Sequence, residues 1–573
     1  MTNIPSASLL GPVSRDAHPT LTEQEALLEA EACLQCGGPC NSAPCVGACP
    51  AGIDIPGFIK AIAEGRPADA AATIFADNVL GGTCARVCPV EVLCQGSCVL
   101  LKEGRRAIQI GRLQRFATDH AIERGINSLK PARPEARKTQ SVGVIGAGPA
   151  GLACAAELAR MGYRVVVYES RDFPGGLVTR GIAPYKQQYK PLPQEVSQIK
   201  ELGVQLRFGV RVGNQITADQ LRASHDAVFI GIGMGDDMPA KLPGEWLPNV
   251  WESLKFIEAL KLGPQGGLKV GKRVAIIGGG NTAIDVAREA RMLHNAEATA
   301  VNTAIDAARH AVTLGAAHVT MLYRRGEADM PAFPHEIAAA KREGVEIMTQ
   351  VAPVEFVGTD HVSGVKCVRM RLGEPDKSGR PRPQPIRGSE FIVEADTVVK
   401  AIGQKPHSEL FASFGIEMNG SLVKINDEMR TNVAGFYAGG DCINGGSTVV
   451  QAVRDGRKAA RAIDRALAGT ERASRPETPA VRVEPDGATI KHFQGDYRLT
   501  TAPKLCKGCN ICVTGCPTDT LALDANNHIK VVDTETCVFC GLCEMRCPDF
   551  AIWIVRGATE RARVFAQEGK PVT

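Results

Sequence analysis

Two cysteine runs near the C-terminus constrain the fold of this chain more than any other feature. Each run has the spacing C-x2-C-x2-C-x3-C-P, and together they contain Cys506, Cys509, Cys512, Cys516, Cys537, Cys540, Cys543 and Cys547. A 4Fe–4S cluster needs four thiolates, which three cysteines of one tight loop and a more distant fourth can supply. Zinc is the alternative, but four-cysteine zinc sites are typically built from separated pairs. Because the complete spacing occurs twice, we predict two 4Fe–4S clusters.

The last cysteine of each run is expected to bind the cluster of the other run, as in two-cluster ferredoxins. On this pattern Cys506, Cys509, Cys512 and Cys547 hold one cluster, and Cys537, Cys540, Cys543 and Cys516 hold the second. The segments KGCNICVTGCP and CGLCEMRCPDFAI also resemble the ferredoxin-like δ-type subunit of 2-oxoacid:ferredoxin oxidoreductases. The resemblance implies an α+β bacterial two-cluster ferredoxin domain at residues 491–573.

Composition argues against several other classes of protein. The net charge is +4 on 573 residues, and no basic block indicates nucleic-acid binding. No apolar stretch approaches the length of about 18 residues that a membrane span requires, and the first residues lack the apolar core of a signal peptide. We therefore expect a cytoplasmic protein. In that reducing compartment its twenty cysteines indicate metal ligands rather than disulfides.

A glycine fingerprint for dinucleotide binding begins the middle of the chain. The segment VGVIGAGPAG places Gly146, Gly148 and Gly151 at G-x-G-x-x-G spacing, between a Val/Ile strand and an Ala-rich helix. Glycines allow the turn to close and the backbone to approach a pyrophosphate at the helix N-terminus, where Pro149 and Ala150 lie. The next strand ends in Glu169, a carboxylate placed to accept hydrogen bonds from ribose hydroxyls.

A second fingerprint, KRVAIIGGGNTAIDVA, follows later in the chain. Gly278 and Gly280 occupy the first two glycine positions, Ala283 occupies the third, and Asn281 and Thr282 lie between them. The strand after it ends in Arg324 and Arg325, where a site for NAD more often carries an acid. Two guanidinium groups suit a 2′-phosphate, so we favour NADP(H) over NAD(H). The alternative is a solvated arginine pair.

The segment 141–470 resembles the glutamate synthase small-subunit family, which includes the N-terminal half of dihydropyrimidine dehydrogenase. The matching segments are GAGPAG, PGGLVTRGIAPYK, GGGNTAIDVA, VTMLYRRGEADMPA, TVVKAIGQKP and AGGD. The resemblance implies FAD on the first fingerprint, with Gly176, Leu177, Gly440 and Asp441 among its ligands and Asp441 at the ribityl chain. A helix from about Thr448 would direct the positive end of its dipole at the flavin ring.

These patterns together predict a multidomain chain with two Rossmann-like α/β domains arranged as in glutathione reductase. We expect a helical domain with two iron–sulfur clusters at 1–135, a FAD-binding domain at 136–255 and 395–470, an inserted NAD(P)H-binding domain at 256–394, a linker at 471–490, and the ferredoxin domain. An Ala-rich insertion after Arg291 is expected to form a helical excursion.

The N-terminal cysteines do not follow ferredoxin spacing, and spacing alone leaves iron–sulfur and zinc open. The segments EACLQC, CPAGIDIPGFI and RVCPVEVLCQGSC, followed by IGRLQRFA, resemble the N-terminal domain of dihydropyrimidine dehydrogenase. The resemblance implies one 4Fe–4S cluster on Cys33, Cys36, Cys45 and Cys98, and another on Cys49, Cys88, Cys94 and Gln114. We treat Cys40 and Cys84 as non-ligands, although Cys40 could compete with Cys36 or Cys45.

The predicted function is electron transfer between NAD(P)H and a partner protein through FAD and four 4Fe–4S clusters. Cofactors of this kind carry the chemistry themselves, so we expect no catalytic side chain. The δ-type resemblance favours thiamine-diphosphate-containing 2-oxoacid oxidoreductase subunits as partners, in a hetero-oligomer. The alternatives are a stand-alone NADPH:ferredoxin oxidoreductase acting on soluble ferredoxin, a glutamate synthase small subunit, or a simple flavoenzyme with structural zinc modules. The direction of electron flow and the cluster potentials stay open.

Overall fold

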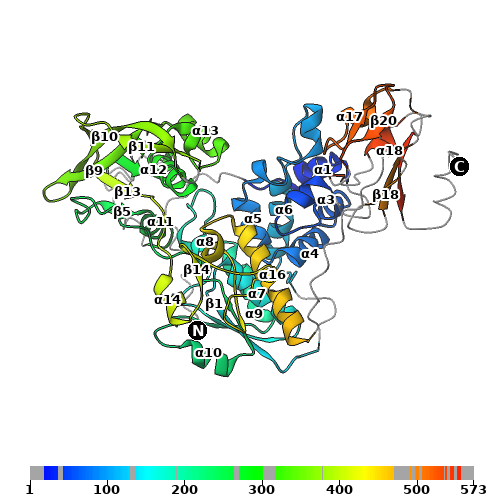
Figure 1. Cartoon of the computed structure of the whole chain (residues 1–573), viewed down its shortest axis with the longest axis horizontal. Helices are drawn as coiled ribbons and strands as arrows, with labels where there is room; N and C mark the ends of the chain where they lie inside the picture. The colour runs from blue at the N-terminus through cyan, green and yellow to red at the C-terminus, as the bar shows by residue number, and fades with distance from the viewer. Residues whose placement is uncertain are drawn as a thin grey trace. The chain divides into compact units, whose positions relative to one another are not determined.

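The computed structural model describes residues 19–36, 43–129, 136–188, 190–263, 270–300, 316–376, 379–469, 489–491, 497–501, 506, 508–533, 536–537, 542–547 and 551–556. The chain divides into two compact units (Figure 1). One unit consists mainly of residues 131–464, and the other combines residues 20–130 with residues 465–573.

A five-stranded parallel sheet forms the centre of the first dinucleotide-binding domain. Its order is β16-β4-β1-β2-β3, with β1 (Ser141–Ile145), β2 (Arg164–Tyr168), β3 (Gln205–Arg207), β4 (Ala227–Ile230) and β16 (Phe436–Ala438). The associated helices are α7 (Pro149–Arg160), α8 (Leu177–Arg180), α9 (Leu192–Glu201), α10 (Ala218–Ser224), α14 (Ser408–Ser413), α15 (Asp441–Asn444) and α16 (Val449–Leu467). Val144 and Phe229 are fully buried, as expected for a parallel sheet covered on both faces.

The second dinucleotide-binding domain has its own five-stranded parallel sheet. The order is β5-β13-β6-β7-β8, with β5 (Val250–Glu252), β6 (Arg273–Ile277), β7 (His318–Tyr323), β8 (Val345–Thr349) and β13 (Thr397–Lys400). Helices α11 (Ser253–Leu262), α12 (Asn281–Ala300) and α13 (Pro334–Arg342) belong to this domain, as do the antiparallel strands β9 (Val351–Gly358), β10 (Val362–Pro375), β11 (Pro381–Pro385) and β12 (Phe391–Glu394). Helix α12 continues into the Ala-rich insertion as far as Ala300, and residues 301–315 lie outside the described residues.

The second sheet is inserted in the sequence between strands of the first, and two of its strands require a correction of the expected boundaries. We expected residues 136–255 and 395–470 to belong to the FAD-binding domain. The structure instead pairs β13 with β6 through Val398 and Ala275, and with β5 through Val398 and Val250. Both β5 and β13 are therefore strands of the second sheet. The chain rejoins the first sheet at β16, which pairs with β4.

The N-terminal part of the second unit is helical. It contains α1 (Glu23–Glu31), α2 (Pro44–Ala48), α3 (Ile55–Ala63), α4 (Pro67–Asp77), α5 (Gly81–Val87) and α6 (Ile110–Glu123), with 3₁₀ turns η3 (Val90–Val92) and η4 (Val99–Glu103). Thr22 and Glu25 form a capping box that starts α1. Phe58, Phe75 and Leu113 are fully buried and bring α3, α4 and α6 into one core.

The described C-terminal residues form a small α+β module. The antiparallel strands β17 (Thr489–Lys491), β18 (Tyr497–Thr501) and β21 (Ile552–Arg556) make one sheet, and β19 (Leu521–Leu523) with β20 (Ile529–Val531) makes a hairpin. Two short helices, α17 (Ile511–Thr514) and α18 (Leu542–Arg546), complete it. Strand β17 begins inside the predicted linker, whose residues 471–488 lie outside the described residues.

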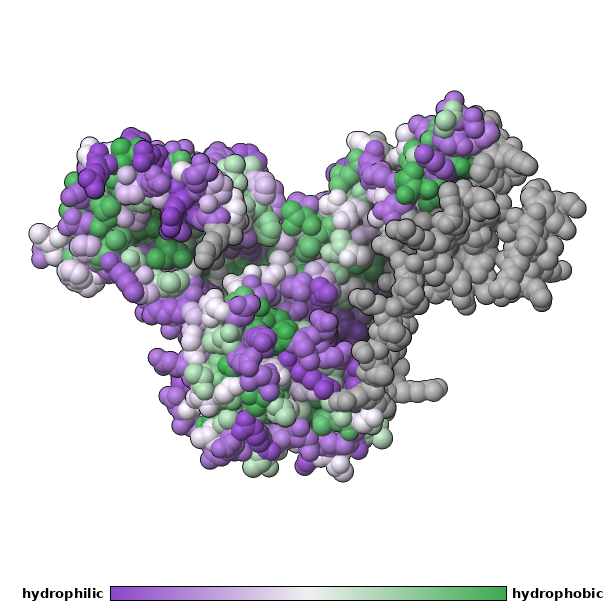
Figure 2. Space-filling model, viewed as in Figure 1, coloured by the Kyte–Doolittle hydropathy of each residue, from purple (hydrophilic) through white to green (hydrophobic). Residues whose placement is uncertain are grey.

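The surface of both units is mixed in polarity. Hydrophilic and hydrophobic residues are interspersed over the face shown in Figure 2. Within the described ranges, no helix has the combination of length and apolar character needed to cross a membrane.

Candidate functional site

The first glycine loop is shaped by two glycines whose geometry requires glycine and by a third that has only loose contacts. Gly146 adopts φ +96°, a region that disfavours residues with a Cβ. A Cβ on Gly151 would lie 1.9 Å from the carbonyl oxygen of Gly146, so close helix–strand packing requires glycine there. A Cβ on Gly148 would meet no atom closer than 3.9 Å. Gly148 therefore leaves room for a pyrophosphate at the N-terminus of α7, where Pro149 is the first helical residue.

Glu169 closes the same loop from the end of β2. Its carboxylate is buried and accepts a 2.8 Å hydrogen bond from the backbone N–H of Ala147 and a 2.9 Å bond from that of Arg171. The acid is thus held against the fingerprint loop. The hydroxyl of Ser170 donates a third bond of 3.3 Å. A carboxylate has about four acceptor sites, so these three bonds leave capacity for a ribose hydroxyl.

The turn at Gly440 and Asp441, the second predicted flavin segment, is held by an acid that the sequence did not indicate. Asp455 of α16 is buried, and its Oδ2 accepts a 3.2 Å hydrogen bond from the N–H of Gly440. Its Oδ1 accepts a 3.0 Å bond from Gln451. Burial raises the pKa of Asp455 and also that of Asp441, where Asp455 adds to the effect. The position of Asp455 in the sequence, as an acid in an Ala-rich helix two turns after Thr448, is the one feature that could have pointed to this role.

Gly440 and Thr448 set the backbone around that acid. Gly440 adopts φ +77°, and a Cβ there would lie 3.0 Å from the Cβ of Ala150, so this turn packs against α7. Thr448 precedes α16, and its Oγ1 accepts a 3.3 Å bond from the N–H of Gln451. Gly176, at φ +53°, brings the turn before Leu177 close to the backbone of Gly148. The predicted flavin residues therefore converge on one region.

The second glycine loop repeats this arrangement in the other sheet. Gly278 adopts φ +141°, and a Cβ there would lie 2.3 Å from the carbonyl oxygen of Ala401. A Cβ on Gly280 would meet nothing closer than 3.9 Å, which leaves the approach to α12 open. Ala283 is fully buried. Asn281, the first residue of α12, accepts a 3.0 Å bond from the N–H of Phe333 and so ties α12 to the turn before α13.

The predicted arginine pair is split by the structure. Arg325 is buried and donates a 2.8 Å bond to Asp376 and a 2.9 Å bond to the carbonyl of Pro381. Its guanidinium therefore connects the end of β7 to the β10–β11 hairpin, which disagrees with the prediction that both arginines face a 2′-phosphate. Arg324 is exposed to solvent. It is the member of the pair that fits the predicted role.

The first set of N-terminal cysteines is brought together around Cys45. Burial raises the pKa of Cys45, and the nearby thiols of Cys94, Cys33, Cys36 and Cys98 raise it further. Three of these four neighbours are the residues assigned with Cys45 to one cluster. The four cysteines expected to bind this cluster therefore lie near one another. Cys94, which was assigned to the other cluster, also lies near Cys45.

The second set includes the one amide side chain among the predicted ligands. Gln114 is buried on α6, and its Nε2 donates a 2.8 Å hydrogen bond to the carbonyl of Gly81. This bond fixes the amide and leaves its oxygen as the donor atom for a metal. Cys49 interacts with Cys94, and both lie near Cys88. The donor set therefore fits a cluster held by three thiolates and an amide oxygen.

Cys84 lies unexpectedly close to that second set. It is buried, and its thiol, followed by burial itself, raises the pKa of Cys88. We expected Cys84 to be a non-ligand. Its proximity to Cys88 follows from its position on α5, one turn earlier. Cys40 lies outside the described residues.

Four of the C-terminal cysteines, from both runs, lie near one another. Burial raises the pKa of Cys512 to about 11, with further contributions from Cys547, Cys506 and Cys509. The sulfur of Cys506 accepts bonds from the N–H groups of Gly508 (3.4 Å) and Ile529 (3.3 Å), and that of Cys547 accepts one from Ala551 (3.2 Å). Such N–H···S bonds stabilise thiolates and tune cluster potentials.

The second C-terminal set is described only in part. Cys516 and Cys537 are buried, Cys543 is half-buried, and Cys540 lies outside the described residues. Across the described ranges, no three His, Cys, Asp or Glu side chains lie as close as the ligands of a single metal ion. The cysteines of a cubane bind separate iron atoms and are spaced more widely.

Comparison with known proteins identifies the parts of the chain. A family model described as pyridine nucleotide-disulphide oxidoreductase matches residues 140–456. The model for dihydropyrimidine dehydrogenase domain II, 4Fe–4S cluster, matches residues 13–126, and a 4Fe–4S dicluster domain matches residues 505–551. The glutamate synthase [NADPH] small chain of Halomonas elongata is 36% identical over 458 residues, which are 77% of this chain and 90% of the relative.

This chain belongs to the glutamate synthase small-chain family.

Other relatives in the family are subunits of different enzymes. The NADPH-Fe(3+) oxidoreductase subunit beta of Geobacter sulfurreducens is 36% identical over 457 residues, 74% of this chain and 64% of the relative. The NADP(+)-dependent formate dehydrogenase subunit beta of Moorella thermoacetica is 36% identical over 458 residues, 75% of this chain and 60% of the relative.

The family assignment decides the class of reaction. The chain is an FAD-dependent NADPH oxidoreductase with 4Fe–4S clusters, and it acts in electron transfer. The two 4Fe–4S models cover both cysteine-rich regions and set aside the zinc alternative for them. When bound, FAD supplies the conversion between hydride and single electrons, and the protein binds and orients the cofactors.

Proposed function

We propose that this chain exchanges electrons between NADP(H) and a partner subunit through FAD and four 4Fe–4S clusters, with the C-terminal ferredoxin domain as the contact to the partner. The observation that carries the proposal is the grouping of Cys547 with Cys506, Cys509 and Cys512 across the two cysteine runs. That grouping supports two clusters in the ferredoxin domain. Cys509 is exposed, and an exposed ligand offers an exit for electrons.

A contact inside the second unit supports electron exchange between its two cluster modules. The turn η4 begins directly after Cys98, a proposed ligand of an N-terminal cluster. Lys102, in this turn, donates a 3.1 Å bond to the carbonyl of Cys516 and forms a 3.1 Å ion pair with Asp519. Cys516 is a proposed ligand of a C-terminal cluster. The contact therefore links the loop that follows Cys98 to the loop that contains Cys516.

The partner we favour is a thiamine-diphosphate-containing 2-oxoacid oxidoreductase, in a hetero-oligomer with this chain. This choice rests on the CPDFAI ending of the second cysteine run, which resembles the δ-type subunit of those enzymes. Anaerobic affinity purification from the native host, followed by thiamine analysis, tests it. The proposal expects co-purified subunits that contain thiamine diphosphate and reduce NADP⁺ when a 2-oxoacid is added. A complex that lacks thiamine diphosphate contradicts this partner.

A second candidate is the role of a glutamate synthase small subunit, favoured by relatives of that name that this chain covers over about nine-tenths of their length. Its partner would use glutamine and 2-oxoglutarate. The same purification separates the two, because NADPH-dependent glutamate formation by the complex would favour the second candidate. Rapid NADPH-dependent reduction of soluble ferredoxin by the isolated chain would favour the stand-alone alternative.

A further inference from the structure

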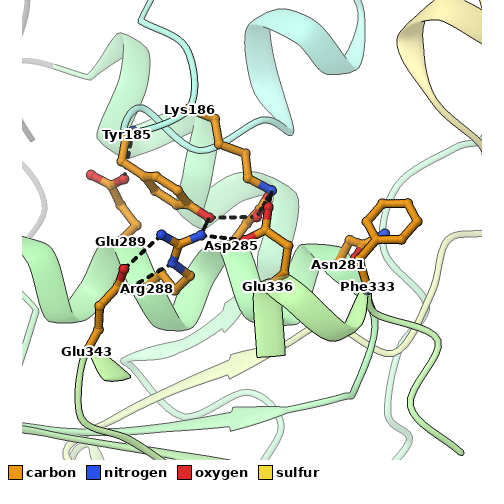
Figure 3. Close-up of polar contacts among 9 residues, drawn as sticks. All are labelled: Tyr185, Lys186, Asn281, Asp285, Arg288, Glu289, Phe333, Glu336 and Glu343. Carbon is orange, nitrogen blue, oxygen red and sulfur yellow. Dashed lines mark hydrogen bonds and ion pairs between the residues drawn. The ribbon is translucent and has the colours of Figure 1, made fainter. Parts of the chain in front are cut away.

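A buried cluster of charged and polar side chains joins the two dinucleotide-binding domains (Figure 3). We call it the interdomain cluster, and its members are Tyr185, Lys186, Asp285, Arg288, Glu289, Glu336 and Glu343. Tyr185 and Lys186 come from the flavin-domain loop between α8 and α9. The other members come from α12, α13 and the residue after α13. Asp285 lies in the second fingerprint segment, after its glycines, and the other members lie outside both fingerprints.

Lys186 is the bridging cation. Its Nζ lies 2.7 Å from Oδ1 of Asp285 and 2.7 Å from Oε1 of Glu336, so it pairs with two helices of the other domain at once. Its side chain is 14% exposed. Burial lowers the pKa of Lys186, but Asp285 and Glu336 outweigh it and the net shift is upward. The ammonium form is therefore the stable one between these carboxylates.

Tyr185 makes a second set of directional bonds across the same boundary. Its hydroxyl donates a 3.0 Å bond to Asp285 and accepts a 3.1 Å bond from Arg288. Its backbone N–H donates a 3.0 Å bond to Glu289. Arg288 is held in turn by two 2.8 Å bonds to Glu343 and by a contact to Glu336. The tyrosine ring and both of its polar groups are thus fixed by the nicotinamide domain.

The cluster lies within a few residues of both cofactor loops. Asp285 is four residues after Asn281, on the first turns of the helix that begins at the second glycine loop. Tyr185 is nine residues after Gly176 in the flavin motif. From α11, Lys261 donates bonds of 2.8 Å and 3.2 Å to the carbonyls of Val178 and Ile182 in the same flavin-domain segment. A shift in this cluster would move one glycine loop relative to the other.

Ionic contacts fix the orientation of one domain relative to another better than apolar contacts do. Two apolar faces can slide with little change in buried area, whereas bonds of fixed direction between charged groups permit one arrangement. Burying such charges costs solvation energy, and removing one partner leaves the other uncompensated. Conformational specificity is a recognised reason for retaining buried ion pairs despite that cost.

We propose that Lys186 and Asp285 are positioning residues for hydride transfer: their ion pair fixes the nicotinamide domain against the flavin domain in the orientation that lets hydride pass. They touch no substrate atom in this role. A misplacement of about 1 Å between reacting groups can cost about a hundredfold in rate. Loss of the pair should therefore slow hydride transfer while the nicotinamide loop, and thus NADPH affinity, stays intact.

The test is anaerobic stopped-flow reduction of the flavin by NADPH in the full chain, at varied NADPH concentration. For Lys186→Met we expect the limiting rate constant to fall about ten- to a hundredfold, with a less than threefold change in NADPH Kd and an unchanged flavin content. Lys186→Arg should recover most of the rate. Lys255→Met is the matched control, because Lys255 pairs with Glu252 at the surface of α11 and should leave the rate unchanged.

A double-mutant cycle separates positioning from general destabilisation. Asp285→Asn should slow the reaction as Lys186→Met does, and the double variant should be no slower than the slower single variant. A limiting rate that Lys186→Met leaves unchanged would overturn the proposal, and so would multiplicative losses in the double variant. If Lys186→Met loses its flavin, Tyr185→Phe tests the same point, with a loss of about three- to tenfold in rate and no change in Kd.

Discussion

The amide nitrogen of Gln114 donates a 2.8 Å hydrogen bond to the carbonyl of Gly81, the first residue of α5. Because α5 ends beside Cys88, this bond fixes the amide of α6 relative to a cysteine of the same proposed ligand set. Arg86 and Asp119 support the arrangement by pairing α5 with α6 at 2.7 and 2.8 Å. The hydrogen bond thus fixes the amide of the proposed ligand Gln114.

Replacing Gln114 with Ala should therefore remove one cluster. The variant loses the amide oxygen and leaves the Gly81 carbonyl without its donor. We expect iron to fall from about sixteen to about twelve atoms per flavin, on the basis of four irons per cubane. Iron and flavin analysis of anaerobically purified protein checks this. Gln109→Ala is the control, because Gln109 bonds Glu29 and should leave the iron content unchanged. Full iron content in both variants would show that Gln114 is no ligand.

The two arginines after β7 should behave differently when each is replaced with Ala. Arg324→Ala should raise the KM for NADPH about tenfold or more, since a charge-assisted phosphate contact is lost, and should leave the KM for NADH nearly unchanged. Arg325→Ala should instead lower the melting temperature, because Asp376 loses a buried partner. Steady-state kinetics with both nucleotides and thermal unfolding measure these effects. Equal KM changes for NADPH and NADH in Arg324→Ala would exclude the 2′-phosphate role.

Asp455 should be needed for flavin retention. Asp455→Ala removes the acceptor that holds the N–H of Gly440, and an unsatisfied buried donor costs about 1–3 kcal/mol. We expect flavin affinity to fall about five- to a hundredfold, measured by absorbance after gel filtration and by titration with added FAD. Asp455→Asn keeps an oxygen at this position and should retain more flavin than the Ala variant. Full flavin retention by Asp455→Ala would remove this role.

Lys261 should make stability depend on pH above neutrality. Burial lowers the pKa of Lys261 to about 7, whereas the unfolded residue titrates near 10.4. Between these values the unfolded chain binds the extra proton, so the contribution of Lys261 to stability rises with pH and is lost as pH falls toward 7. The neutral amine still has two N–H groups for Val178 and Ile182.

The measurement is the melting temperature of wild type minus that of Lys261→Met, from pH 7.5 to pH 9.5. This difference should grow with pH. The corresponding difference for Lys255→Met should stay flat, because Lys255 is exposed and charged throughout this range. A difference that shrinks with pH for Lys261→Met would contradict the assigned shift.

The sequence indicates those parts of the candidate site that depend on local chemistry. Gly146 and Gly151 are required by a positive φ and a close approach, and such requirements leave a mark on the sequence itself. Strands β5 and β13 were assigned to the wrong domain. Strands of three or four residues are too short to show a periodic pattern, and the sheet that they join is decided by partners far along the chain. The side chains of Arg325 and Asp455 were likewise decided by tertiary contacts with Asp376 and Gly440. The interdomain cluster unites residues about a hundred positions apart, and nothing in the local pattern of either segment indicates that their side chains meet.

The most direct test of the account is the number of electrons that the chain can pass to NADP⁺. The protein is reduced anaerobically with dithionite, freed of excess reductant by gel filtration, and mixed with excess NADP⁺ while NADPH formation is recorded. Four one-electron clusters and one two-electron flavin in a single circuit predict up to about three NADPH per flavin. Cys547→Ser should yield less than wild type. A yield of about one NADPH per flavin in both proteins would show that the clusters are not connected to the flavin, and would contradict the account.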